Sequence, residues 1–177
     1  SLVGSEMCIR DRYYIEGLAK GDYTLVETLA PSEYVISSNV NFSVDDSGKV
    51  HQVKMVDKQV KFTKTDVTGE KEVEGAEITV TDKETNQVVD KWTSGKDAHY
   101  ISGLKEGKTY VLSEVVSPEG YVKSTDIEFT VTTDKETQKV NMKDKRVEFT
   151  KTDVTGEKEV EGAEITVTDK ETNEVVD

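Results

Sequence analysis

Apolar and polar residues alternate over short stretches along most of the chain, and this pattern predicts β-strands separated by polar turns. In the middle of the chain, the alternating stretches are bounded by turn-forming sequences such as DVTGEKEVEG, TDKETN and KEGK. No long stretch has the i, i+3, i+4 spacing of apolar residues that is typical of an amphipathic helix. We therefore expect an all-β fold, an antiparallel β-sandwich. The expected strands are 59–65, 75–82, 87–93, 98–103, 108–116, 125–132 and 138–145.

The sequence also repeats itself with a period of 87 residues. The segment KFTKTDVTGEKEVEGAEITVTDKETNQVVD at 61–90 returns at 148–177 with two differences, and VETLAPSEYV at 26–35 aligns with SEVVSPEGYV at 113–122 at the same offset. Such a period predicts tandem β-sandwich repeats. The expected divisions are the C-terminal half of a truncated repeat at 13–58, a complete repeat at 59–145, and the N-terminal third of a truncated repeat at 146–177. We interpret the chain as a fragment of a longer tandem array.

Three ionisable side chains fall on strand faces that are otherwise apolar. In VKFTKTD, strict alternation places Lys64 on the same face as Val60 and Phe62. The same rule aims Glu114 and Asp144 inward from the strands near 108–116 and 138–145. Because burying an unpaired charge costs several kcal/mol, one amine and two carboxyls on inward faces indicate a buried site. The residues alone leave two interpretations open, a reactive site or a salt-bridge network that never reacts.

Four motifs of the complete repeat, FTKTD, GAEITVTD, YVLSEVVSPEGY and VNMKDK, resemble the Cna protein B-type family. This family comprises prealbumin-like or Ig-like repeats of Gram-positive surface proteins and SpaA-type pilins. The resemblance implies an isopeptide bond between Lys64 as the amine and Asp144 as the acceptor, with Glu114 as the proton-carrying acid. Asn141 is a rival acceptor by residue type, but alternation places it on the opposite face.

The resemblance further implies a structural stalk repeat of an adhesin or pilin, attached to the cell wall outside a Gram-positive bacterium. Cross-linking would be a single-turnover, autocatalytic event, so we do not expect an enzyme. The alternative is an adhesin module that binds a host matrix protein or a glycan, with the lysine and its two carboxylates acting only as a salt-bridge network. The expected partners within the chain are the neighbouring repeats.

The truncated repeats carry incomplete copies of the same site. Glu27 and Asp57 align with the glutamate and the acceptor, and Lys151 aligns with the amine. Because the tail supplies the first strands and the head supplies the last four, we consider head-to-tail self-association of two copies. Glu33 replaces the glycine at position 120 of the complete repeat, where a positive φ is expected.

Composition narrows the function classes. Charged residues make up 33% of the chain and the formal net charge is −13. This balance argues against nucleic-acid binding, which requires a basic face. No apolar run approaches the roughly 18 residues that cross a bilayer, so we expect no membrane insertion in this sequence. The single cysteine, Cys8, has no partner for a disulfide within the chain.

No motif for a cofactor or a metal is present. His51 and His99 are the only histidines, and neither is accompanied by a serine or cysteine in a triad pattern. The acidic turns lack the spaced ligands and the pivotal glycine of a calcium loop. We therefore expect neither a metal nor a cofactor. Residues 1–12, SLVGSEMCIRDR, match no part of the repeat and resemble translated adapter sequence, so we exclude them from the fold.

Overall fold

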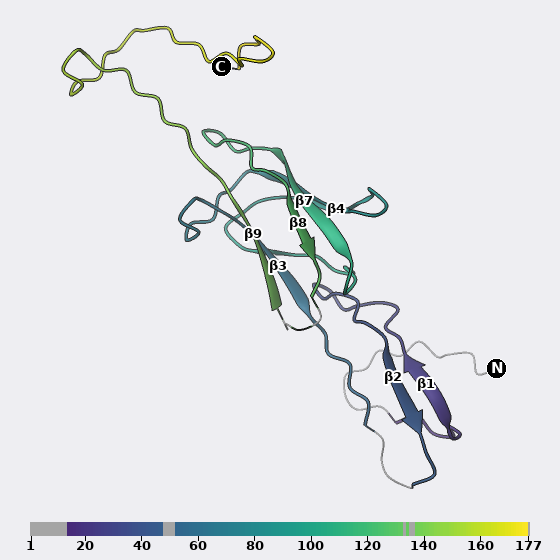
Figure 1. The fold of residues 1–177 in the computed structure, drawn as a ribbon. Coiled ribbons are helices and arrows are strands. Elements are labelled where there is room, and N and C mark those ends of the chain that lie inside the picture. Colours follow the sequence, from purple (N-terminus) through teal and green to yellow (C-terminus); the bar gives the residue numbers. More distant parts are fainter. Residues whose placement is uncertain (1–13, 48–51, 133, 135–136, 177) are drawn as a thin grey trace.

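The computed structural model describes residues 14–47, 52–132, 134 and 137–176. Along its length lie a small two-stranded unit at the N-terminal side, a two-sheet sandwich in the middle, and an extended tail (Figure 1). Among the described residues, no helix is long and apolar enough to span a membrane. The expected adapter-derived segment, Cys8 and His51 lie outside the described residues.

The middle unit contains seven strands at the positions that the alternation predicts. They are β3 (Gln59–Thr65), β4 (Glu77–Asp82), β5 (Val88–Thr93), β6 (His99–Tyr100), β7 (Thr109–Val116), β8 (Ile127–Thr130) and β9 (Thr137–Lys143). One sheet has the order β6-β3-β9 and the other has the order β5-β4-β7-β8. The all-β sandwich that we expected is therefore confirmed.

One strand pair differs from the antiparallel expectation. β3 and β9 pair in parallel, with Lys64 opposite Met142, whereas every other pair of named strands is antiparallel. The physical reason is that β3 and β9 are joined by a long crossover through both sheets, and only a tight hairpin forces neighbouring strands to run in opposite directions. As a result, the C-terminal ends of the first and last strands lie together at one end of the sandwich.

The core lies between the two sheets and is built from the inward positions of each strand. In β3, Val60 and Phe62 are 1% and 2% exposed, and the strand alternates between buried and half-buried positions. The ring of Phe62 meets Phe129 edge-to-face at 5.4 Å and lies 5.7 Å from the ring of Trp92. Aromatic pairs in this geometry stabilise a core beyond the area they bury.

The N-terminal unit pairs β1 (Gly21–Leu25) with β2 (Val40–Val44) in an antiparallel ribbon. At the 87-residue offset these strands align with β7 and β8. We expected four strands here, whereas the described residues of this unit form only these two named strands. Residues 53–58 align with β9 but form only an isolated bridge between Val35 and Lys58. In the complete repeat β9 pairs with β3, and no such neighbour lies beside this segment within the described residues.

The turn at Glu33, just before the bridge between Val35 and Lys58, has the positive φ that the aligned glycine predicts. Glu33 has a φ of +69° and Gly120, its counterpart, has a φ of +76°. The expectation of a positive φ at this position is confirmed, and Glu33 holds a conformation that is costly for a residue with a Cβ.

The tail repeats the sequence of β3 to β5 without forming their strands. Phe149 is 69% exposed and Ile165 is 61% exposed, whereas their counterparts Phe62 and Ile78 are each 2% exposed. The tail keeps the local turns, for instance the bridge between Thr152 and Glu159. A strand needs a neighbour for its backbone hydrogen bonds and a cover for its apolar face, and the described tail has neither.

Candidate functional site

A lysine and two carboxylates meet inside the sandwich of the complete repeat. Lys64 comes from β3, Asp144 follows β9 in the same sheet, and Glu114 comes from β7 in the facing sheet. Their exposed fractions are 2%, 1% and 1%. The parallel pairing of β3 and β9 brings the acceptor to the lysine, because Asp144 lies just beyond the residue opposite Lys64.

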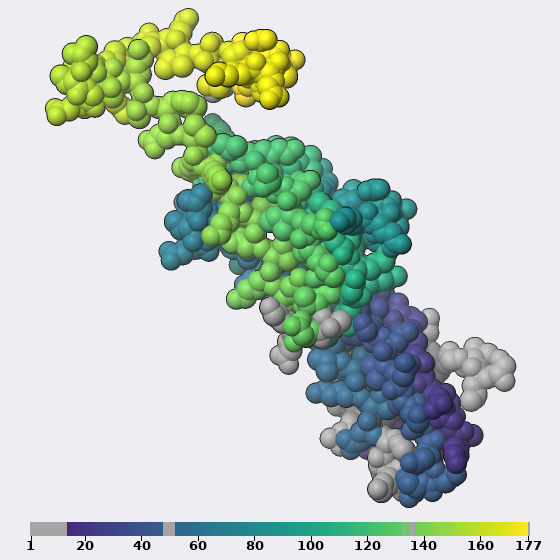
Figure 2. All heavy atoms as spheres, viewed as in Figure 1, coloured from purple at the N-terminus to yellow at the C-terminus, as the bar shows by residue number. Residues whose placement is uncertain are grey.

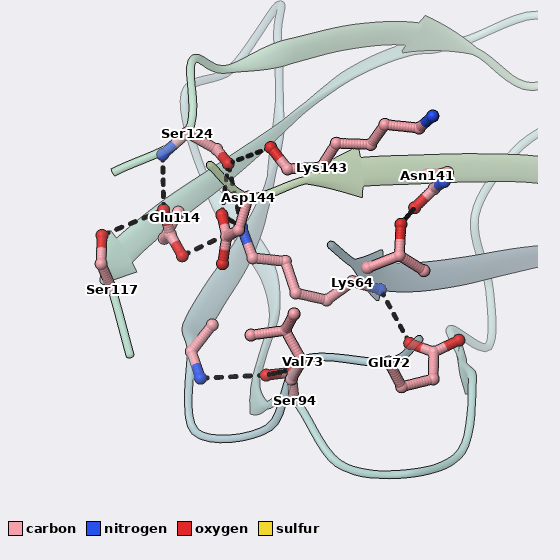
Figure 3. A network of polar contacts seen from close by, with 12 residues as sticks. Lys64, Glu72, Val73, Ser94, Glu114, Ser117, Ser124, Asn141, Lys143 and Asp144 are labelled. Atoms are coloured by element: carbon pink, nitrogen blue, oxygen red, sulfur yellow. Dashed lines mark hydrogen bonds and ion pairs between the residues drawn. The ribbon is translucent and has the colours of Figure 1, made fainter. Parts of the chain in front are cut away.

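The amine lies between the two carboxylates (Figure 3). Lys64 Nζ is 2.5 Å from Asp144 Oδ1 and 2.9 Å from Glu114 Oε1. With all three groups ionised, the cluster carries one net negative charge in a volume closed to solvent. Desolvating each ion costs several kcal/mol, so each buried charge needs close partners such as these.

The backbone on both sides of the contact is held by hydrogen bonds. Asp144 N donates to Thr65 O at 2.8 Å, and Val73 N donates to Lys64 O at 2.7 Å. Asp144 Oδ2 has no hydrogen-bond partner among the described residues, although it is buried. An unsatisfied buried oxygen of this kind costs about 1–3 kcal/mol.

Ser124 belongs to the site, and the sequence analysis missed it. Its Oγ accepts a hydrogen bond from Lys64 Nζ at 3.1 Å and lies 2.6 Å from Asp144 Oδ1. Its backbone N–H donates to Glu114 Oε2 at 2.6 Å. Ser124 therefore contacts all three charged groups at once. The available signal was the repeat offset, because a serine stands at the aligned position 37 as well.

Asn141 lies apart from the cluster. Its side chain is on the other face of β9, where its Oδ1 accepts a hydrogen bond from Thr65 Oγ1 at 3.0 Å. The alternation argument placed it there, and the structure agrees.

The N-terminal unit holds the carboxylate half of an equivalent site. Ser37 N donates to Glu27 Oε2 at 2.7 Å, and Ser37 Oγ donates to Val56 O at 3.0 Å. These contacts reproduce those of Ser124 with Glu114 Oε2 and with the carbonyl of Lys143. A hollow of about 410 Å³ lies beside Glu27 and Ser37.

The remaining members of the incomplete sites are not gathered into a cluster. Asp57 is exposed, and so is Lys151 in the tail. The structure thus brings together only the site of the complete repeat.

His99 has a packing role at the sheet edge. Its ring stacks on Trp92 with centroids 4.2 Å apart, and its Nε2 is 2.7 Å from Asp90 Oδ2. In the part of the chain that the structure describes, no group of three or more His, Cys, Asp or Glu side chains could hold a metal ion.

Several solved structures are similar to the chain, all with TM-scores below 0.5. The shaft pilin SpaA from Lactobacillus rhamnosus GG has 15% identity and a TM-score of 0.44, covering 72% of this chain and 65% of that one. The Bacillus anthracis TIE protein has 24% identity and a TM-score of 0.40, covering 73% and 26%. The group B streptococcus pilus 2b backbone protein has 19% identity and a TM-score of 0.44, covering 68% and 52%. The chain thus spans between 26% and 65% of the length of these proteins.

A search of curated protein sequences found no match. A family profile described as the SpaA prealbumin-like fold domain matches residues 11–59 and again residues 58–146. These two matches cover more than half of the sequence and meet where the N-terminal unit gives way to the complete repeat. The chain therefore belongs to the SpaA prealbumin-like fold domain family.

Proposed function

We propose that the chain is a stalk segment of an extracellular, wall-attached surface protein, in which Lys64 and Asp144 become joined by an isopeptide bond. The observation that carries the proposal is the contact of the lysine amine with two carboxylates, all at most 2% exposed. Membership of the prealbumin-like family and the tandem repeat support the stalk role.

The reaction is a condensation that releases one water. The neutral amine of Lys64 attacks Cγ of Asp144, and a C–N bond forms. One Asp144 oxygen leaves with the hydroxyl proton of the acid and one proton from the amine. In water at neutral pH both partners are in the unreactive charged state, whereas a site closed to solvent disfavours charge.

Glu114 has the geometry of a proton carrier. Its Oε1 contacts the amine at 2.9 Å, and its Oε2 is fixed by Ser124 N. In the protonated form it accepts a proton from the attacking nitrogen while it gives one to the departing oxygen. Asp144 Oδ2 is the suitable leaving oxygen, because Oδ1 is already held by Ser124 and Oδ2 has no such partner.

The fold contributes by positioning. The reacting groups are 80 residues apart in sequence, yet they are in contact in the sandwich. Holding two reactants in an attack geometry can contribute about 7–11 kcal/mol toward the barrier, compared with a bimolecular encounter.

The bond would redirect mechanical load. β3 begins at the end of the sandwich that meets the N-terminal unit, and β9 ends at the opposite end, where the tail departs (Figure 1). Tension enters at Gln59, reaches Lys64, crosses to Asp144 and leaves. The intervening chain carries no load, and full extension would require breaking a covalent bond.

Intact-protein mass spectrometry tests the proposal. We expect the purified chain to be lighter by one water than its sequence, and Lys64→Ala to restore the full mass. Lys61→Ala is the matched control, since Lys61 lies in the same strand on the opposite face. A folded wild-type chain with an unshifted mass would refute the cross-link and leave the salt-bridge alternative.

The adhesin alternative makes a different prediction. A module that grips a host protein or a glycan would bind an immobilised matrix protein or a glycan array through the complete repeat. Binding that survives Lys64→Ala in folded protein would assign a recognition role independent of the buried cluster.

Self-association of two copies is a second proposal, motivated by the tail. Its apolar side chains are exposed where their counterparts in the complete repeat are buried, and Glu27 with Ser37 borders an open hollow. The tail of one copy would supply the missing first strand to the N-terminal unit of another, bringing Lys151 to Glu27 and Asp57. Denaturing gels and sizing of the purified chain decide this, and monomer alone by both methods would reject it.

A further inference from the structure

The N-terminal unit and the complete repeat meet without a linker. Lys58 forms the last bridge of the first unit, and β3 starts at the next residue. In the space-filling view the two units abut, while the tail extends away from the opposite end of the complete repeat (Figure 2). The contact between the two units is therefore an observed example of how one repeat follows another.

Three backbone hydrogen bonds cross this contact. Ile36 N donates to Leu104 O at 2.7 Å, and Gly103 N donates to Tyr34 O at 2.9 Å. Glu106 N donates to Ile36 O at 3.2 Å. Because these bonds use main-chain atoms, they do not depend on the side chain at position 36.

A buried ion pair closes the contact. Glu106 Oε1 is 2.5 Å from Lys58 Nζ, with side chains only 4% and 16% exposed, and Glu106 Oε2 accepts a hydrogen bond from Ser38 N at 2.8 Å. Burial alone would raise the pKa of Glu106, but the hydrogen bonds from Lys58 and Ser38 outweigh it and hold that pKa below its ordinary value. Between the two units, Val35 is fully buried in the core cluster.

The far end of the complete repeat presents the corresponding surface without a cover, with Gly120 and Lys123 at the positions of Glu33 and Ile36. Both surfaces begin with the same turn: Tyr121 N donates to Pro118 O in the complete repeat, as Tyr34 N donates to Pro31 O in the N-terminal unit. The bridge between Val122 and Lys145 copies the bridge between Val35 and Lys58. Val122, however, is 46% exposed, whereas Val35 is 0% exposed.

We propose that residues 120–124 together with Lys145, here called the distal surface, form a docking site for another repeat of this kind. The occupant is the loop that corresponds to 102–106 in that repeat, and its glutamate pairs with Lys145 as Glu106 pairs with Lys58. Successive repeats then take one fixed relative orientation, so an array behaves as a stiff rod. This inference does not require the isopeptide bond.

Thiol labelling tests the distal surface, because the reactivity of a cysteine follows its exposure. In a Cys8→Ser background, Val35→Cys reports on the covered surface and Val122→Cys on the uncovered one. In the 177-residue chain we expect Val122→Cys to be labelled at least about tenfold faster than Val35→Cys. Equal rates in the two variants would overturn the premise.

The decisive experiment supplies the occupant. Adding the sequence of residues 91–145 after Asp177 completes the tail as a repeat, because 148–177 matches 61–90. We expect labelling of Val122→Cys to slow toward the rate of Val35→Cys. Replacing the glutamate of the added repeat that corresponds to Glu106 with glutamine should restore fast labelling of Val122→Cys. Unchanged labelling of Val122→Cys in the extended chain, with the added repeat protected from hydrogen exchange, would overturn the proposal.

The existing contact provides a second test if the added repeat does not fold. Glu106→Gln in the original chain should raise the labelling rate of Val35→Cys several-fold, because the pair that closes the contact is lost. Glu119→Gln is the matched control, as Glu119 is exposed and lies outside the contact. A labelling rate that is the same in both variants would refute the role of the glutamate.

Discussion

Stability measurements on variants of the buried cluster can distinguish a covalent cross-link from a salt bridge that never reacts. We consider two variants of the complete repeat. Lys64→Met removes the amine and leaves two carboxylates at most 1% exposed without their cation. Lys64→Met/Glu114→Leu/Asp144→Leu removes every charge of the cluster and fills the space with apolar side chains.

The two interpretations predict different magnitudes. A cross-link between groups 80 residues apart stabilises by about 4–5 kcal/mol in the loop-closure model. In Lys64→Met, the unpaired buried carboxylates lower the free energy of unfolding by about a further 3–5 kcal/mol. In the triple variant, replacing the whole ion cluster with apolar side chains is by itself often neutral or stabilising. With a cross-link, the triple variant loses about 4–5 kcal/mol and Lys64→Met loses more. Without a cross-link, the triple variant is at least as stable as the wild type.

The assay is urea unfolding followed by the fluorescence of Trp92, the only tryptophan of the chain. Its ring packs against Phe62, so the signal reports on the complete repeat alone. A cross-linked unfolded state exposes less surface, so the slope of the unfolding free energy with urea should also be smaller for the wild type. A triple variant with the midpoint and slope of the wild type would refute the cross-link.

Three further predictions follow from the same structure. Phe62→Ala should lower the free energy of unfolding by about 3–5 kcal/mol, because Phe62 is 2% exposed. Phe149→Ala, at an exposed position of nearly identical local sequence, should change it by less than about 0.5 kcal/mol in the same urea assay. Glu33→Gly should raise the melting temperature, since removing the Cβ at a φ of +69° relieves about 1 kcal/mol of strain; a lower melting temperature would contradict this. The depressed pKa of Glu106 contributes stability that is present above the ordinary value of 4.5 and is lost as the pH falls through the folded-state pKa. Because only the thiolate reacts, the labelling rate of Val35→Cys is divided by that of Val122→Cys at the same pH. This ratio should rise on acidification when Glu106 is present and stay constant in Glu106→Gln.

Ser124 illustrates what pattern reading overlooks. A single serine in a turn-rich stretch is not distinctive by itself, because serines are common in turns, and only its recurrence at the 87-residue offset marks it. Its hydroxyl and amide reach Lys64, Asp144 and Glu114 only because the segment that carries it folds over the end of the sandwich. The contact between repeats at Glu106 was missed for the same reason, since nothing local links residue 106 to Lys58.

The residues themselves determined the strand positions, the repeat, and the inward direction of Lys64, Glu114 and Asp144. These properties depend on the two-residue period of an extended chain, which is local and therefore readable along the sequence. The tertiary structure decided the parallel pairing of β3 with β9, which brings the amine to the acceptor. It also decided that nearly identical segments, 61–89 and 148–176, become buried strands in one place and an exposed tail in the other. The reason is that hydrogen-bonding partners and apolar cover are supplied by distant parts of the chain.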